Sequence, residues 1–222
     1  MTSSKSGRHD VTLRQGTLRN VPFADGATLL GGYANAVETP LLSALECVTA
    51  TAPLRHMQTR GGYRMSVGMT NCGSAGWISD RRGYRYGPLD PDSGEPWPAM
   101  PPPFADVATR AAAAAGFEGF VPDVCLINRY EPGARMALHQ DVDERDFDAP
   151  IISVSLGLPA VFLFGGLQRS DRPRRLALVH GDVVVWGGPA RKSFHGVLPL
   201  ADGDHPVTGH QRFNLTFRRA LP

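Results

Sequence analysis

The segment Arg212-Phe213-Asn214-Leu215-Thr216-Phe217-Arg218 alternates strictly between polar and apolar side chains. Such alternation is typical of a β-strand whose two faces meet different surroundings. The apolar face predicts a packed core on one side of the strand. The other face carries two arginines, which need an anionic partner unless that face lies in water. An amphipathic strand with a solvated face is therefore the alternative to a strand that binds an anion.

Other short runs of β-branched or aromatic residues precede this strand, and Gly, Pro or Asp separates most of them. They cover residues 124–130, 151–158, 161–164, 176–179 and 183–186. Many short strands with turn residues between them predict an antiparallel sandwich or barrel. We therefore expect an α+β chain that is mainly β, with a jelly-roll core over residues 120–219.

Two helices are expected to pack outside this core. Thr39 followed by Pro40 is typical of a helix N-cap and first helical position, which predicts a helix over residues 40–50. A run of three prolines followed by the alanine-rich residues 104–115 predicts a second helix. Gly116 is expected to end it.

The length of 222 residues suits a single domain, which we place at residues 16–222, after a flexible N-terminal tail of residues 1–15. Three cysteines, an odd number without paired spacing, argue against a disulfide framework and favour a reducing compartment. No apolar run reaches the roughly 18 residues of a membrane span, and the N-terminus lacks the apolar core of a signal peptide. We expect a soluble, cytoplasmic monomer without a membrane partner.

Residues 51–90 hold much of the positive charge. The chain has a formal net charge of +2, whereas this segment has six arginines and two aspartates, which leaves −2 for the rest. Trp77 and three tyrosines lie among these arginines. Basic residues with aromatic neighbours can neutralise phosphates and stack on bases, and a solvated, loop-rich surface is the alternative. Residues 83–103 contain seven prolines, and we expect them to form an irregular cover rather than core.

His139-Gln140-Asp141 is a candidate metal site. Residues two apart in an extended segment share a face. Two imidazoles and one carboxylate form the facial triad of non-haem Fe(II) oxygenases. Spacing alone leaves the second histidine open among His180, His195, His205 and His210. The two arginines of residues 212–218 suggest a partner for the metal, a small acid with two carboxylates.

Together these segments resemble the AlkB family of Fe(II)- and 2-oxoglutarate-dependent dioxygenases, from about Gly61 to Arg218. The matching segments are GYRMSV (62–67), NCG (71–73), CLINRY (125–130), LHQD (138–141), SVSLG (153–157), HGDVVVW (180–186) and RFNLTFR (212–218). The resemblance implies a double-stranded β-helix, another name for the jelly roll, with N-terminal helices. It also implies a nucleotide-recognition lid over residues 51–100.

The resemblance further implies the roles of individual residues. His139, Asp141 and His195 would hold Fe(II), which selects His195 from the open candidates, and 2-oxoglutarate and O2 would take the remaining positions. The residues implied for the co-substrate are Asn128, Tyr130, Arg212, Asn214 and Arg218. Those implied for the substrate are Trp77, Tyr84, Asp143 and Arg169.

The implied reaction is oxidative N-demethylation of 1-methyladenine and 3-methylcytosine in DNA, which repairs alkylation damage and releases formaldehyde. Methylation at these ring nitrogens blocks base pairing and so lowers the cost of flipping the base. Single-stranded DNA is the expected partner, with double-stranded DNA left open. The alternative is the same chemistry on RNA such as tRNA, or on a substrate that is not a nucleic acid. A non-enzymatic jelly-roll binding module is a third hypothesis.

Two departures from the family pattern bear on nucleic-acid binding. Val142 is apolar where the family has a basic residue that contacts the backbone. Asp80 and Arg82 change the charge of the loop after Trp77. These departures leave the chemistry intact, but they put the strength of DNA binding and the strand preference in doubt.

Overall fold

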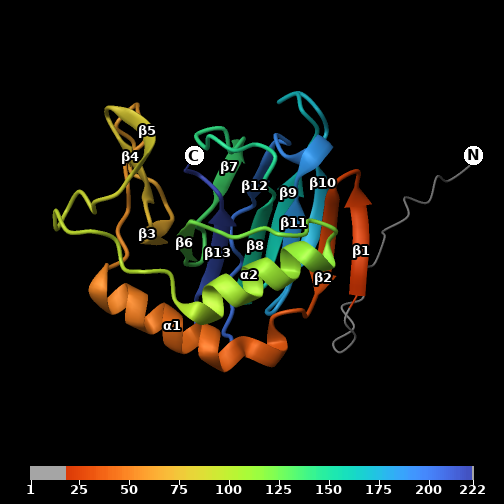
Figure 1. Cartoon of the computed structure of the whole chain (residues 1–222), viewed down its shortest axis with the longest axis horizontal. Helices are drawn as coiled ribbons and strands as arrows, with labels where there is room; N and C mark the ends of the chain where they lie inside the picture. The colour runs from red at the N-terminus through yellow and green to blue at the C-terminus, as the bar shows by residue number, and fades with distance from the viewer. Residues whose placement is uncertain (1–18, 222) are drawn as a thin grey trace, which may run out of the picture.

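Two β-sheets face each other, and two helices cover the outer side of the larger one (Figure 1). The computed structural model describes residues 19–221, so the predicted tail, residues 1–15, lies outside the described residues. The larger sheet contains, in spatial order, β1 (Arg19–Ala24), β2 (Ala27–Gly31), β11 (Val183–Trp186), β8 (Ile151–Gly157), β13 (Arg212–Arg218), β6 (Val124–Tyr130) and β3 (Gly68–Gly73). The smaller sheet contains β10 (Arg174–Leu178), β9 (Ala160–Phe164), β12 (His195–Val197) and β7 (Met136–His139). The predicted jelly-roll class, mainly β, is confirmed.

The alternating strand, β13, lies inside the larger sheet between β8 and β6, and both neighbours are antiparallel to it. Its apolar residues belong to the core under the helices, where the rings of Phe217 and Phe104 meet edge to face at 5.9 Å. Its polar residues therefore point to the opposite side, toward the smaller sheet. Both of its arginines are buried, so the alternative of a solvated face is wrong.

The two predicted helices are α1 (Glu38–Thr51) and α2 (Pro102–Ala114). Gly116 follows α2 with a φ of 88°, as expected at a helix end. The predicted N-cap at Thr39 is wrong, because α1 begins at Glu38 and its N-cap is Val37. The cause is a short 3-10 helix, η1 (Asn35–Val37), which runs directly into α1 and removes the need for a side-chain cap.

The space between the sheets is filled by aromatic and aliphatic side chains. Phe162 and Phe164 of β9 contact Trp186 of β11, with ring centroids 6.1 and 6.2 Å apart. All three are buried. This filling holds the two sheets at a fixed separation and leaves one end free for polar side chains.

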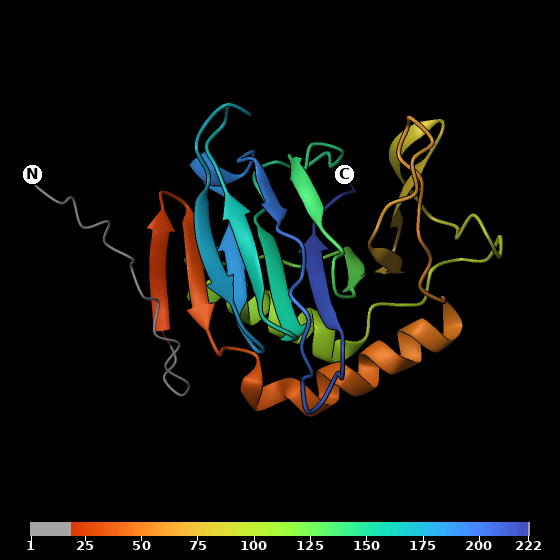
Figure 2. The same ribbon diagram turned by 180° about the vertical axis from the view of Figure 1, so that it is seen from behind.

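A hairpin of β4 (Gly76–Asp80) and β5 (Gly83–Gly87) stands to one side of the sandwich, as Figures 1 and 2 show from opposite directions. The expectation of an irregular cover over residues 83–103 is wrong for β5, which pairs along its length with β4. It is also wrong for Trp97, which is 4% exposed and donates from Nε1 to the Gly87 carbonyl. Between residues 19 and 221, no helix has the length and apolar character needed to cross a membrane.

Candidate active site

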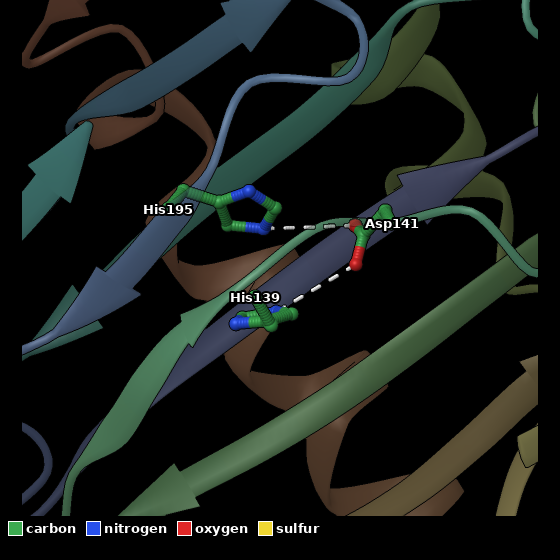
Figure 3. A group of neighbouring side chains, drawn as sticks. All are labelled: His139, Asp141 and His195. Atoms are coloured by element: carbon green, nitrogen blue, oxygen red, sulfur yellow. Dashed lines mark ion pairs between the residues drawn. The ribbon is translucent and has the colours of Figure 1, made fainter. Parts of the chain in front are cut away.

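Three side chains, those of His139, Asp141 and His195, converge beside the paired strands β7 and β12 (Figure 3). His139 ends β7, His195 begins the adjacent β12, and the register places these two residues opposite each other. Asp141 follows two residues after His139. Nε2 of His139 lies 3.6 Å from Oδ1 of Asp141, and Nε2 of His195 lies 3.8 Å from Oδ2. One ligand atom from each residue lies within 4.8 Å of the others.

Backbone carbonyls orient both imidazoles. Nδ1 of His139 lies 2.9 Å from the Ala137 carbonyl oxygen, and Nδ1 of His195 lies 3.0 Å from that of Ser193. A carbonyl oxygen only accepts, so the proton of each neutral ring belongs on Nδ1. Each Nε2 therefore keeps a free lone pair toward the centre of the cluster. Two neutral imidazoles and a carboxylate are the donor set that suits Fe(II).

The charges of the cluster favour a cation in the same way. Burial opposes ionisation of Asp141, but Arg218, His195 and His139 outweigh it and hold its pKa well below the ordinary value. Burial lowers the pKa of His195 to about 4, and His139 adds to this effect. At neutral pH the site therefore offers an ionised carboxylate and a neutral His195, both ready to bind a metal.

Arg218 at the end of β13 holds the Asp141 carboxylate in place. Its Nη2 and Nε donate to Oδ2 at 2.6 and 2.9 Å. Oδ1 of Asp141 receives no hydrogen bond from Arg218, so it stays available to a metal. A ligating carboxylate that is itself hydrogen-bonded is the usual arrangement in metal sites.

A cleft lies beside the cluster and is open to solvent. Its volume, which includes the part that is open to solvent, is about 410 Å³. Asn128, Tyr130, Asn214 and Arg218 line it together with the two histidines. The polar faces of the adjacent strands β6 and β13 supply these four side chains: Asn128 and Tyr130 come from β6, and Asn214 and Arg218 come from β13.

Arg212 lies deeper, with 1% of its surface exposed. Its guanidinium carbon lies 5.2 Å from the ring centroid of Tyr130, and Nη2 donates to Ser155 Oγ at 3.0 Å. Nε and Nη1 of Arg212 are buried and have no hydrogen-bond partner among the described residues. Burial lowers the pKa of Arg212 and raises that of Tyr130 to about 12. An unpaired buried guanidinium is costly, and a carboxylate of a bound acid would satisfy it in bidentate fashion.

The remaining candidate histidines lie elsewhere. The His180 and His205 rings stack on each other at 4.6 Å, and Nε2 of His180 lies 2.6 Å from Glu38. Nδ1 of His210 lies 2.7 Å from the Gly203 carbonyl oxygen. Among the described residues, the geometry therefore brings only His195 to the His139–Asp141 pair.

Contacts tie the four residues expected to bind substrate, directly or through one another, to the segment of residues 138–143. The Trp77 ring stacks on Tyr84, with centroids 5.5 Å apart and planes 19° apart. Nε1 of Trp77 donates to Oδ2 of Asp143 at 2.8 Å. Arg169 extends from the loop before β10 and donates to the Leu138 carbonyl at 2.8 Å, next to His139.

The two departures from the family pattern have different consequences. Val142 is 49% exposed between Asp141 and Asp143, so this position is open to a partner. Asp80, by contrast, accepts two hydrogen bonds from Arg85 at 3.0 and 2.8 Å, and Arg82 also contacts it. The pKa of Asp80 is correspondingly lowered, chiefly by Arg85. The added acid is thus neutralised within the hairpin.

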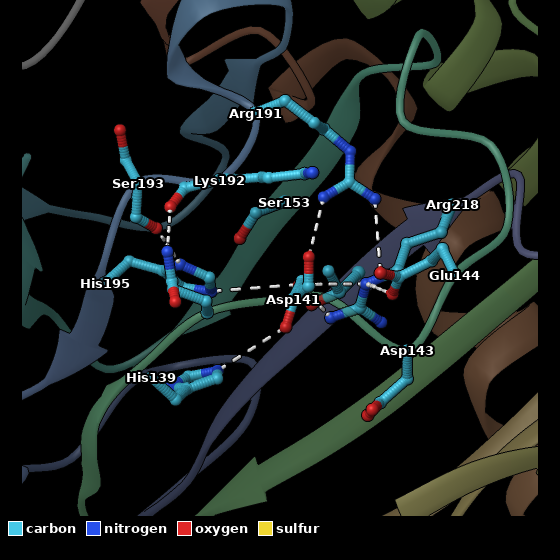
Figure 4. Close-up of polar contacts among 12 residues, drawn as sticks. His139, Asp141, Asp143, Glu144, Ser153, Arg191, Lys192, Ser193, His195 and Arg218 are labelled. Carbon is cyan, nitrogen blue, oxygen red and sulfur yellow. Dashed lines mark hydrogen bonds and ion pairs between the residues drawn. The ribbon is translucent and has the colours of Figure 1, made fainter. Parts of the chain in front are cut away.

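Two buried charged residues near the cluster had no predicted role (Figure 4). Glu144 is 5% exposed and Arg191 is 3% exposed. Arg191 donates to the Asp141 main-chain carbonyl at 3.0 Å, and its Nη2 lies 3.3 Å from Glu144. Glu144 stands in a run of charged residues that is typical of a solvated loop, so no sequence pattern pointed to its burial.

Comparison with known proteins gives one consistent result. The sequence profile of the 2OG-Fe(II) oxygenase superfamily matches residues 26–218. The alpha-ketoglutarate-dependent dioxygenase AlkB of Escherichia coli (strain K12) is 55% identical over 199 residues, which cover 90% of this chain and 92% of that protein. The tRNA demethylase abh1 of Schizosaccharomyces pombe is 31% identical over 53% of this chain and 40% of its own length. The solved structure of OsALKBH1 superimposes with a TM-score of 0.76 at 27% identity, over 92% of this chain and 99% of that one.

Proposed function

Since the chain belongs to the 2OG-Fe(II) oxygenase superfamily, we propose that it demethylates alkylated bases in DNA by oxidation. The proposed lesions are 1-methyladenine and 3-methylcytosine, and the proposed role is repair of alkylation damage. One observation carries the proposal. Arg212, a buried arginine with two nitrogens that lack a partner among the described residues, lies against Tyr130, and Tyr130 lines the same cleft as the histidines of the His139–Asp141–His195 cluster.

His139, Asp141 and His195 are the proposed ligands of Fe(II). When bound, the metal with 2-oxoglutarate and O2 supplies the oxidation of an N-methyl group, and the resulting hydroxymethyl group leaves as formaldehyde. Arg212 is proposed to pair with a carboxylate of 2-oxoglutarate. Arg218 orients Asp141 and has a third nitrogen, Nη1, without a partner among the described residues.

Three further side chains are proposed to complete the co-substrate site. Asn128 and Tyr130 point from β6 into the cleft, and Asn214 points into it from β13. Oδ1 of Asn128 is buried and lacks a hydrogen-bond donor within the described part of the chain. A buried acceptor without a donor is unusual in a folded protein, and it supports a ligand or ordered water at this position.

Trp77, Tyr84, Asp143 and Arg169 are the proposed substrate contacts. Trp77 offers an aromatic face, and stacking on such a face holds a base that has left the helix. Asp143 places a negative charge beside Trp77, which suits the positive charge of a base methylated at a ring nitrogen. Arg169 is exposed near His139 and can meet a phosphate.

We place these roles within one dioxygenase domain, residues 16–222. Residues 51–100 form the proposed nucleotide-recognition lid, and residues 120–219 form the proposed core. A cytoplasmic monomer is our proposal for the protein in the cell. The free thiols of Cys47, Cys72 and Cys125 agree with a reducing compartment.

The experiment that tests the function is demethylation of an oligonucleotide containing 3-methylcytosine. Wild-type protein with Fe(II) and 2-oxoglutarate should release formaldehyde and succinate in equal amounts, and Asp141→Ala should release neither. A loaded wild-type protein that demethylates no nucleic acid contradicts the proposal.

RNA is the second candidate substrate, because one relative of this chain is a tRNA demethylase. RNA and DNA share the phosphates and bases that the lid would contact. Competition between DNA and RNA oligonucleotides with the same methylated base, read by mass loss, distinguishes the two. Preferential loss of the methyl group from RNA would replace DNA as the substrate.

A further inference from the structure

Glu144 is a buried carboxylate that joins the hairpin to the metal ligands. Its Oε1 accepts a hydrogen bond from the Tyr86 hydroxyl at 2.7 Å and lies 3.2 Å from Nε of Arg218. Its Oε2 lies 3.3 Å from Nη2 of Arg191. Only 2% of the Glu144 side chain is exposed. Removing a carboxylate from water costs free energy, and here the carboxylate has three partners from three segments of the chain. We therefore expect these contacts to contribute to the site.

The same two arginines fix Asp141. Arg218 donates twice to the Asp141 carboxylate, and Arg191 donates to the Asp141 main-chain carbonyl (Figure 4). Asp141 is therefore fixed at its side chain and at its backbone. Glu144 contacts both arginines and supplies the second negative charge of a buried group of two carboxylates and two guanidiniums.

Tyr86 brings the hairpin into this group. It lies on β5, next but one after Tyr84, and its hydroxyl reaches Glu144 across 58 residues of sequence. Burial raises the pKa of Tyr86 well above 10, so the hydroxyl keeps its proton and remains the donor to Glu144. Glu144 thus links the hairpin to the two arginines that orient Asp141, because it contacts Tyr86 on one side and both arginines on the other.

We propose that Glu144 is a positioning residue that couples the seating of the β4–β5 hairpin, through Tyr86, to the geometry of Asp141. The proposal rests on the assignment of Asp141 as a metal ligand and deepens the proposed function. If seating the hairpin improves metal binding, then metal binding must improve the seating of the hairpin by the same factor. The lid would close more readily over a loaded site than over an empty one.

The first test measures Mn(II) binding to the metal-free full chain with saturating 2-oxoglutarate, by the electron paramagnetic resonance of free Mn(II). Partners of ligating carboxylates typically change metal affinity by about 10- to 100-fold, and Tyr86 acts one contact farther away. We expect Tyr86→Phe to weaken binding about 3- to 10-fold. Tyr63→Phe is the matched control, since Tyr63 is 78% exposed in the same N-terminal half, and it should bind as wild type does.

The second test asks whether Tyr86 acts through Glu144. Glu144→Gln should weaken Mn(II) binding more than Tyr86→Phe, because it removes the charge that both arginines face. Adding Tyr86→Phe to Glu144→Gln should then cause little further loss, whereas independent effects would multiply. Full multiplication of the two losses contradicts the coupling.

The third test reads the hairpin itself by hydrogen exchange of the amides of residues 77–86. Mn(II) with 2-oxoglutarate should slow this exchange in wild-type protein and in Tyr63→Phe, but much less in Tyr86→Phe. A general loss of stability would instead speed exchange equally in the empty and loaded states.

The outcomes separate the two proposals. A wild-type protein that binds no Mn(II) in the presence of 2-oxoglutarate overturns the proposed function and this inference with it. Wild-type binding that is matched by Tyr86→Phe, with equal protection of the hairpin, overturns the inference alone.

Discussion

Arg212 and Arg218 stand at the two ends of the same strand and on the same face, but their electrostatic surroundings are opposite. Arg218 is paired with Asp141 and Glu144, and these acids raise its pKa against the effect of burial. Arg212 has no acidic partner among the described residues, and burial lowers its pKa. The charge of Arg218 is thus balanced by acids of the protein, whereas the charge of Arg212 is left for a ligand.

Arg212→Gln should separate co-substrate binding from stability. A hydrogen bond to a charged group contributes about 1.5–3 kcal/mol, so we expect the KM for 2-oxoglutarate to rise about 10- to 150-fold. The metal-free variant should unfold at a urea concentration no lower than wild type, because an unpaired buried charge has been removed. Steady-state kinetics and urea denaturation check the two parts. A KM within threefold of wild type would rule out Arg212 as the anchor of the acid.

The stability of the metal-free protein should fall as the pH is lowered from about 6.5 to about 4. The pKa of His195 falls from 6.5 in the unfolded chain to about 4 in the folded one, so the unfolded chain binds the proton first. Between pH 7 and pH 5 this one group should remove about 2 kcal/mol from the free energy of unfolding. Asp141, with its lowered pKa, adds a further loss below about pH 4.

His195→Gln is the control for this pH dependence, because its side chain does not titrate. Urea denaturation of both metal-free proteins at pH 7 and pH 5 gives the comparison. An equal loss of stability in wild type and variant would show that His195 is not the group responsible.

Trp77→Ala should weaken the binding of a methylated oligonucleotide. Stacking on an aromatic side chain contributes about 1–3 kcal/mol per base, which predicts a rise in KM of about 5- to 150-fold. Binding of 2-oxoglutarate should stay unchanged, since Trp77 lies on the hairpin outside the acid site. Trp77→Phe should recover part of the loss, because it keeps an aromatic face but removes the donor to Asp143. Equal KM values for all three proteins would assign Trp77 a structural role.

Val142→Lys should strengthen the binding of single-stranded DNA and steepen its salt dependence. Each added phosphate contact changes the slope of log K against log salt by about 0.7 for single strands. Val21→Lys is the matched control, because Val21 is also exposed but lies on β1 at the far edge of the larger sheet. Fluorescence anisotropy at several salt concentrations measures both slopes. The same change in both variants would reflect net charge alone.

Strict alternation and strong β-propensity predicted the central strands well. The predicted strand 124–130 coincides with β6, and 183–186 coincides with β11. Both are largely buried and contain several β-branched or aromatic residues, so β-propensity and packing favour the same structure. The alternation of β13 also predicted that the face opposite the core, which carries Arg212 and Arg218, is the face of the candidate site.

The bounds of β7 and β12, the strands that carry the proposed metal ligands His139 and His195, were not predicted. β7 has four residues and β12 has three, too few for a periodic pattern, and β12 contains a glycine. They are strands because their neighbours in the smaller sheet pair with them. Because this pairing is not visible in the sequence, spacing left four histidines as candidates for the second histidine of the site. The register of β7 and β12 brings His195 opposite His139.

The sequence also could not predict the buried charged group around Asp141, to which Glu144 and Arg191 belong. Glu144 lies between Asp143 and Arg145, in a run that composition assigns to a solvated surface. Its burial depends on Arg191 and Arg218, which are distant in sequence. A charge that is paired only in the folded state leaves no local signal.

The two halves of the site belong to opposite sheets. His139 and His195 come from the smaller sheet, whereas Arg212 comes from the larger one. The thickness of the sandwich therefore sets how far the proposed metal ligands lie from Arg212, the proposed anchor of the acid, and the rings of Phe162 and Trp186 act as spacers. Changes in the volume of the Phe162 ring should retune the chemistry without altering any polar group.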